Sequence, residues 1–246
     1  MFCPEYSPGE IAATLLGSSE AADEVRKNTE LAAGVRARVL LAGEYGVGKR
    51  RIAQIIHRHS IQSHAPFIAV RCTDRLPPDL ETRLFGNGCS VRGALARADG
   101  GTLFLEKLDK LAPRLQERLV DVLANGRPNV RIISAITTPL LDKVSSGGFR
   151  SDLYYLLNQI LIQVPPLRER AEDVEPLLDF FTAYYARRHG CEPPTLDAES
   201  RLTCRVYGWP ENLRQLQAAA ARFVVSGVDA EGLTGEFLRL TERART

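Results

Sequence analysis

ARVLLAGEYGVGKRRIAQIIHRHS, residues 37–60, joins an apolar β-type run to a glycine-rich loop and then to a helical pattern. The loop fits G-x-x-x-x-G-K, a pattern in which backbone N–H groups and the start of a helix bind phosphate oxygens, while the lysine reaches the terminal phosphates. The residues expected to hold a nucleotide are those of the loop: Gly43, Gly46, Val47, Gly48, Lys49 and Arg50. Arg50 stands where this pattern usually has the Ser or Thr that binds magnesium, so any metal has to rely on other groups.

Short apolar runs alternate with helical patterns between residues 36 and 164, which favours an α/β fold: a parallel sheet with helices on both faces. The runs are nearly all apolar, as a sheet buried on both sides requires. The predicted strands are 37–43, 67–72, 101–106, 130–136 and 159–164. After Pro166 only helical patterns appear, so we predict an α/β domain over residues 1–166 and a small helical domain over residues 167–246.

The composition limits the classes of function. With 246 residues, 44% of them hydrophobic, the chain can build one sizeable core and a small second domain. A net charge of +2 gives no reason to expect that the whole surface of the protein binds nucleic acid. Five scattered cysteines predict neither a disulfide framework nor a zinc site. No apolar run is long enough for a membrane span and the first residues lack a basic signal-peptide start, so we expect a cytoplasmic protein without a membrane partner.

Further motifs carry a resemblance to a known family. They are RLFG (83–86), ADGGTLFL (98–105), VRIISA (130–135), GGFRSDLYYLLN (147–158), VPPLRERAEDV (164–174) and GWPENLRQL (208–216). Together with the phosphate loop they resemble the central AAA+ domain of the bacterial enhancer-binding proteins, the sigma-54-dependent transcription activators. The resemblance implies a P-loop AAA+ fold with a helical lid, ATP or ADP as ligand with Mg²⁺ as a candidate cofactor, and assembly into rings. In this family the residue after the loop lysine is commonly not Ser or Thr, so Arg50 departs less from the family than from the general phosphate-loop pattern.

The strand end at Glu106 and Lys107 departs from this family, which has Asp followed by Glu there. The Asp holds magnesium and the Glu activates the attacking water. Glu106 has a longer side chain that could still reach magnesium, and it is the candidate metal ligand. Lys107 cannot accept a proton in the protonated state that lysines have near neutral pH. We therefore predict that hydrolysis is strongly reduced or abolished, even if Lys107 points to solvent.

Two more departures concern control of hydrolysis and the contact with sigma-54. Arg71 replaces an asparagine that, in the family, holds the hydrolytic glutamate; we expect Arg71 to meet the like charge of Lys107 or to point to solvent. Residues 87–92, NGCSVR, are too short for the family's sigma-54-contacting loop and lack its aromatic residue. We therefore reject a conventional activator role and interpret the chain as a degenerate, stand-alone member of the family.

Other family positions are partly retained. The resemblance implies that Arg150 reaches into a neighbouring subunit's site and that Arg214 in the lid senses the nucleotide, although both could be ordinary surface charges. Leu156 replaces a second inter-subunit arginine, and Thr137 replaces an asparagine that would reach the γ-phosphate. We therefore expect the chain to keep nucleotide binding and contact between subunits, and to lose ATP hydrolysis.

Three hypotheses follow. The first is a regulator in transcription that binds ATP or ADP and acts on another protein, either a full-length enhancer-binding protein or its own copies in a homo- or hetero-oligomer; here Lys107 could add charge near the γ-phosphate. The second is a slow ATPase, completed by a partner or using Glu106 or Asp109 to activate water. The third is a pure interaction module with a relic phosphate loop. No helix-turn-helix pattern follows the helical segment, so we expect no sequence-specific DNA reader in this sequence.

Overall fold

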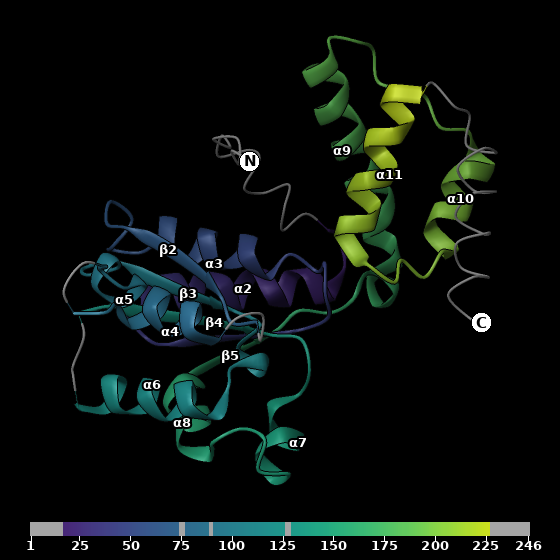
Figure 1. Ribbon diagram of the computed structural model, residues 1–246. Helices are drawn as coiled ribbons and strands as arrows, with labels where there is room; N and C mark the ends of the chain where they lie inside the picture. Colours follow the sequence, from purple (N-terminus) through teal and green to yellow (C-terminus); the bar gives the residue numbers. More distant parts are fainter. Residues whose placement is uncertain (1–16, 74–76, 89–90, 126–128, 227–246) are drawn as a thin grey trace. The chain divides into compact units, whose positions relative to one another are not determined.

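Two compact units make up the described part of the chain. The computed structural model describes residues 17–73, 77–88, 91–125 and 129–226 (Figure 1). Residues 25–44 and 49–164 form an α/β unit, and residues 17–24, 45–48 and 165–226 form a helical unit. Residues 89–90 of the short segment 87–92, and the end of the predicted helical domain at 227–246, lie outside the described residues.

A five-stranded parallel sheet lies at the centre of the α/β unit, in the order β2-β3-β4-β1-β5. Its strands are β1 (Val39–Ala42), β2 (Phe67–Arg71), β3 (Thr102–Glu106), β4 (Arg131–Ile136) and β5 (Ile160–Gln163). All five predicted strands are therefore confirmed. The central strands are almost entirely buried, whereas β2 and β5 are partly exposed because each edge strand has a neighbour on one side only.

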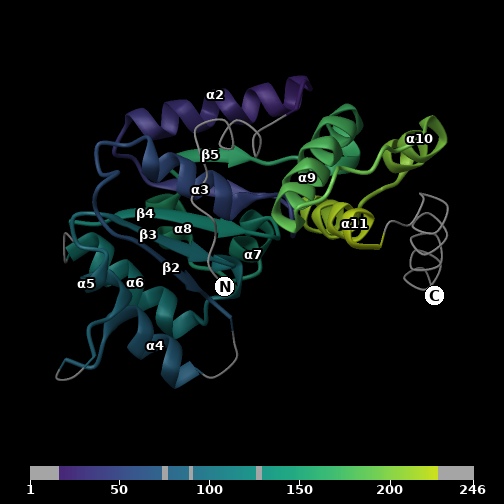
Figure 2. The same cartoon turned by 90° about the horizontal axis from the view of Figure 1, so that it is seen from above.

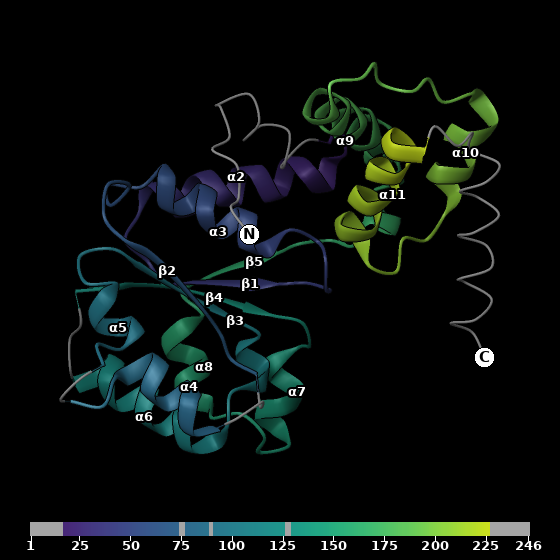
Figure 3. The same cartoon turned by 45° about the horizontal axis from the view of Figure 1, so that its top comes forward.

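Helices cover both faces of this sheet. Figures 1 and 3 show α2 and α3 over one face and α4, α5, α6 and α8 over the other. The helices of this unit are α2 (Glu20–Gly34), α3 (Lys49–Arg58), α4 (Pro77–Phe85), α5 (Ala94–Arg97), α6 (Pro113–Asn125), α7 (Leu140–Ser145) and α8 (Ser151–Leu157), with the first residues of α2 counted in the helical unit. In α3, for example, the buried positions include Ile52 and, three and four residues further on, Ile55 and Ile56, so one apolar stripe of the helix faces the core.

The helical unit has a separate core. Its elements are the 3-10 segment η2 (Leu167–Asp173), α9 (Val174–His189), α10 (Ala198–Val206) and α11 (Asn212–Ser226). Figures 1 and 2 both show α9 and α11 side by side, and Leu178, Trp209, Leu216 and Phe223 are buried between the elements of this unit. The Trp209 indole donates a hydrogen bond to the carbonyl of Cys204 at 2.8 Å, so its polar atom is satisfied.

Candidate functional site

The candidate site begins where the parallel strands end. Because β1 to β4 run in the same direction, the residues at their carboxyl ends come to one edge of the sheet. Gly43 follows β1, Arg71 ends β2, Glu106 ends β3 and Thr137 follows β4. These positions are scattered over about a hundred residues of sequence, and the sheet brings them to a single edge.

Lys49 opens α3 and folds back onto its own loop. Its ammonium group donates to the carbonyl oxygens of Gly43 and Glu44, at 2.6 and 2.7 Å. Burial lowers the pKa of Lys49 from 10.5 to about 8, against the opposing effect of the nearby Asp109 and Glu106 carboxylates. A buried cation whose hydrogen bonds go to neutral carbonyls favours an anion beside it, so this end of the loop fits a phosphate group.

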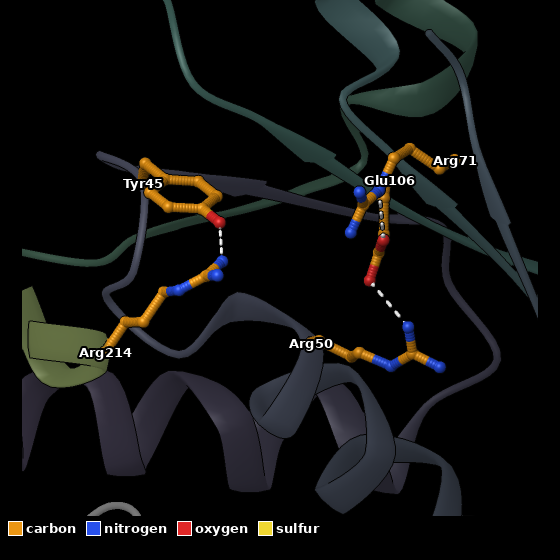
Figure 4. A network of polar contacts seen from close by, with 5 residues as sticks. All are labelled: Tyr45, Arg50, Arg71, Glu106 and Arg214. Atoms are coloured by element: carbon orange, nitrogen blue, oxygen red, sulfur yellow. Dashed lines mark hydrogen bonds and ion pairs between the residues drawn. The ribbon is translucent and has the colours of Figure 1, made fainter. Parts of the chain in front are cut away.

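Two arginines hold the carboxylate of Glu106 (Figure 4). Arg50 Nη1 lies 3.2 Å from Oε1, and Arg71 Nε lies 3.5 Å from Oε2. Arg71 stands directly opposite Glu106 in the β2–β3 register, whereas Arg50 comes from the first turn of α3. The Arg71 side chain is 59% exposed, which agrees with the expectation that it points to solvent. Its pairing with Glu106 was not expected from the sequence; it forms because the carboxylate one residue before Lys107 offers an opposite charge in the adjacent strand.

Lys107 has the backbone conformation of a tight turn. Its φ of 55° and ψ of 45° lie in the left-handed region, and it precedes the 3-10 segment η1 (Leu108–Lys110). A non-glycine residue rarely adopts this conformation, which costs free energy and is concentrated at functional sites. The chain thus turns sharply at the position that directly follows the Glu106 carboxylate, and it places a cationic side chain there.

Asp109 is engaged by hydrogen-bond donors. It is 3% exposed, and its carboxylate accepts from the Thr137 N–H at 3.1 Å and from the hydroxyls of Thr137 and Thr138, each at 3.2 Å. The Lys143 ammonium also donates to the Asp109 carbonyl. These bonds fasten the turn after β3 to the end of β4. A carboxylate whose oxygens already accept these bonds is a poor candidate for activating water. Thr137, in turn, uses its N–H and its hydroxyl to anchor Asp109.

Residues 45–48 of the loop contact the start of α11 within the helical unit. Asn212 Nδ2 donates to the Tyr45 carbonyl at 2.9 Å, while its Oδ1 accepts the Leu167 N–H at 2.7 Å. A Cβ atom at Gly46 would lie 2.0 Å from the Glu211 carbonyl oxygen, and Gly46 has φ +82°, so only glycine fits there. This part of the phosphate loop is therefore packed as a member of the helical unit.

Arg214, the arginine expected to sense nucleotide, also contacts Tyr45. Its guanidinium hydrogen-bonds the Tyr45 hydroxyl and lies 5.3 Å from the centroid of that ring (Figure 4). Sequence reasoning missed Tyr45 and Asn212. One signal was available for Asn212: it follows the turn-forming WPE and has φ +54°, a conformation that asparagine tolerates better than most residues.

Arg150, the arginine expected to reach another subunit, pairs within its own chain. It precedes α8, and its guanidinium contacts the Asp152 carboxylate at 2.7 and 3.1 Å. Hydrogen bonding and charge raise the pKa of Arg150 and lower that of Asp152. Both side chains are 44% exposed, so the pair lies at a surface. Leu156, in place of the second arginine, is half-buried in α8.

Two classes of site are not found in the described part of the chain. Among those residues, no group of three or more His, Cys, Asp or Glu side chains is arranged to hold a metal ion. The helices described are also too short or too polar to cross a bilayer.

A parallel sheet with a glycine-rich phosphate loop after its strand β1, together with a small helical unit, defines a P-loop AAA+ fold. Residues 15–163 match the family model described as the Sigma-54 interaction domain, and residues 168–240 match the AAA+ ATPase lid domain. The chain therefore belongs to the Sigma-54 interaction domain family, as its motifs indicated.

Relatives in this family are transcription regulators. The chain is 36% identical over 243 residues to the transcriptional regulatory protein XylR of Pseudomonas putida, covering 91% of this chain and 43% of that protein. It is 38% identical to the regulator NtrC of Klebsiella pneumoniae, covering 80% and 46%. A solved structure of NtrX from Brucella abortus in complex with ATP has 30% identity and a TM-score of 0.82, covering 87% of this chain and 54% of that one. The chain thus spans about half the length of these relatives.

Proposed function

We propose that this chain is a nucleotide-binding regulator of transcription in the cytoplasm, which hydrolyses ATP weakly or not at all and acts through contacts with other proteins. The observation that carries the proposal is a G-x-x-x-x-G-K loop at residues 43–49 beside a strand end, Glu106–Lys107, with lysine where the family resemblance implies a water-activating glutamate. Lys49 donates hydrogen bonds to carbonyls of its own loop, and Lys107 directly follows Glu106 at the turn after β3.

Nucleotide binding is supported by the loop and by a relative. The loop offers Lys49 with the backbone of Gly43, Gly46, Val47 and Gly48 to phosphate oxygens, and the first turn of α3 adds the N-terminal end of a helix. NtrX of Brucella abortus, which has the same fold, was crystallised with ATP and with ADP. We therefore assign ATP or ADP as the ligand of this loop.

Impaired hydrolysis is supported by what surrounds the expected reaction centre. Two carboxylates are the alternatives for activating water. Glu106 is held by two arginines, and Asp109 is buried and engaged by three donors. The oxygens of both carboxylates are already engaged by cations or by N–H and hydroxyl donors, so neither is positioned to hydrogen-bond a water molecule and take its proton.

Action through another protein is supported by the bonds that Tyr45 makes to α11. A ligand that displaces these loop residues has to disturb the Asn212 and Arg214 contacts, because both residues bind Tyr45. Nucleotide occupancy can in this way change the surface that the helical unit offers to a partner. The partner proposed is a full-length enhancer-binding protein or a second copy of this chain, with the exposed Arg150 at the contact.

Paired measurements of binding and turnover test this function. Equilibrium binding of a fluorescent ATP analogue should be lost in Lys49→Ala and retained in the matched control Lys110→Ala, whose side chain is exposed on η1. Phosphate release by the wild-type chain should not exceed that of Lys49→Ala. Turnover that disappears in Lys49→Ala would support a slow ATPase instead, and failure to bind at millimolar nucleotide would leave an interaction module with a relic loop.

A further inference from the structure

A P-loop site normally holds Mg²⁺ with two kinds of oxygen ligand. One is the hydroxyl of the residue after the loop lysine, and the other is a carboxylate at a neighbouring strand end, with phosphate oxygens and water completing the shell. In this chain the first position is Arg50, which offers only N–H donors, and the second is Glu106. Of these two positions, only Glu106 therefore offers the metal a side-chain oxygen.

That carboxylate already has cationic partners. Each of its oxygens faces a guanidinium, Oε1 towards Arg50 at 3.2 Å and Oε2 towards Arg71 at 3.5 Å (Figure 4). The Glu106 side chain is only 15% exposed, so little of the carboxylate is accessible to a further ligand. Lys107 follows immediately in the chain and adds a fourth nitrogen-bearing cation to Arg50, Arg71 and Lys49 around this strand end.

A divalent cation does not fit this environment. Mg²⁺ requires near-octahedral oxygen coordination, and a guanidinium stays protonated at any physiological pH, so it cannot step aside by losing charge. Binding Mg²⁺ to Glu106 would require both arginines to be displaced, with like charges left close to the ion. The residues around Glu106 are therefore unsuited to the Mg²⁺ ion that a P-loop fold implies.

The same arginines are suited to a different task. Their side chains are 57% and 59% exposed, which allows the guanidinium groups to turn from Glu106 to an incoming anion. A guanidinium presents paired N–H donors that match two phosphate oxygens, and its bonds to phosphate are charge-assisted. Arg50 is the residue next to Lys49, so it lies beside the end of the loop that fits a phosphate group.

We propose that Arg50 and Arg71 take the place of the divalent cation, so that this site binds the phosphates of a nucleotide without Mg²⁺. This inference rests on the proposed nucleotide binding and adds its metal dependence. Glu106 then serves as a resting partner that keeps the two guanidinium groups at the site when no nucleotide is bound.

The test compares ATP affinity in EDTA with ATP affinity in excess Mg²⁺, by isothermal titration calorimetry on the whole chain. The dissociation constant is expected to differ by less than about twofold between the two buffers, because guanidinium groups supply the charge that the metal would supply. An affinity weakened about tenfold or more in EDTA overturns the inference while the proposed nucleotide binding stands. Absence of binding in both buffers overturns both proposals.

Variants assign the effect to the arginines. Arg50→Thr combined with Arg71→Ala introduces a hydroxyl at the general phosphate-loop position and releases Glu106, so ATP binding in EDTA should weaken by about tenfold and added Mg²⁺ should now recover it. The matched control is Arg58→Ala, an exposed arginine in the last turn of the same helix, which should bind equally well in both buffers. If the double variant still binds ATP equally well with and without Mg²⁺, the two arginines do not replace the metal. Thermal unfolding by circular dichroism verifies that each variant is folded, and Arg50→Gln provides a milder replacement if the double variant is not.

Discussion

The pKa of Lys49 leads to a quantitative prediction for nucleotide binding. Burial holds this pKa at about 8 in the free protein, and the group must be protonated to attract phosphate. With that value, roughly three quarters of the molecules carry the proton at pH ~7.5 and roughly one tenth at pH ~9. If only the charged form binds, the dissociation constant for ATP rises about eightfold over this interval, or about 1.2 kcal/mol of binding free energy.

Fluorescence anisotropy of a labelled ATP analogue measures this change, and starting at pH ~7.5 keeps the last phosphate ionisation, near pH ~6, outside the range. Lys49→Arg keeps its charge throughout and should show a flat pH profile, whereas Lys110→Ala should retain the wild-type slope. A wild-type affinity that does not change between the two pH values would refute the argument, as would an equal slope in Lys49→Arg.

The free protein should show the opposite trend in stability. The unfolded state holds the Lys49 proton up to a pKa of 10.5 and the folded state only up to about 8, so the unfolded state binds more protons between these values. The free energy of unfolding therefore gains from this group as pH rises through that window, and the gain should be missing in Lys49→Met. Urea unfolding at the two ends of the window measures the difference.

Three further predictions concern stability, each measured as the free energy of unfolding in urea. Gly46→Ala should destabilise by about 1–3 kcal/mol, because its Cβ would clash with the Glu211 carbonyl at a positive φ. Asp109→Ala should cost about 2–4 kcal/mol, because the Thr137 N–H loses its charged acceptor. Asn212→Gly keeps the positive φ but loses both side-chain hydrogen bonds, so it should cost about 1–2 kcal/mol.

A matched control separates the clash at Gly46 from its backbone strain. Gly190 has φ +68°, and a Cβ atom added there would have no other atom within 4 Å, so Gly190→Ala carries the strain alone. If both alanine variants lose the same stability, the close approach of Glu211 is not what requires glycine at position 46. For Asp109, a loss below about 1 kcal/mol would contradict its anchoring role, and for Asn212 an unchanged stability would do so.

The sequence by itself determined the α/β character of the chain and the phosphate loop. Continuous apolar runs indicate strands that are buried on both faces, so β1 to β5 were predictable. The spaced glycines before Lys49 indicate a loop that leads into a helix, so α3 was predictable as well. Both signals reside in contiguous residues, and this is why the order of residues along the chain is enough to reveal them.

Only the tertiary structure decided which charges meet. Arg71 and Glu106 are 35 residues apart and Arg50 and Glu106 are 56 apart; their pairing follows from the register of β2 on β3 and from the docking of α3. The sequence showed these residues as separate departures from a family pattern. Asn212 likewise binds Tyr45 across 167 residues. The charge of a side chain is local information, but its partner is selected by long-range packing, and here that partner decides whether a carboxylate faces a metal or a guanidinium.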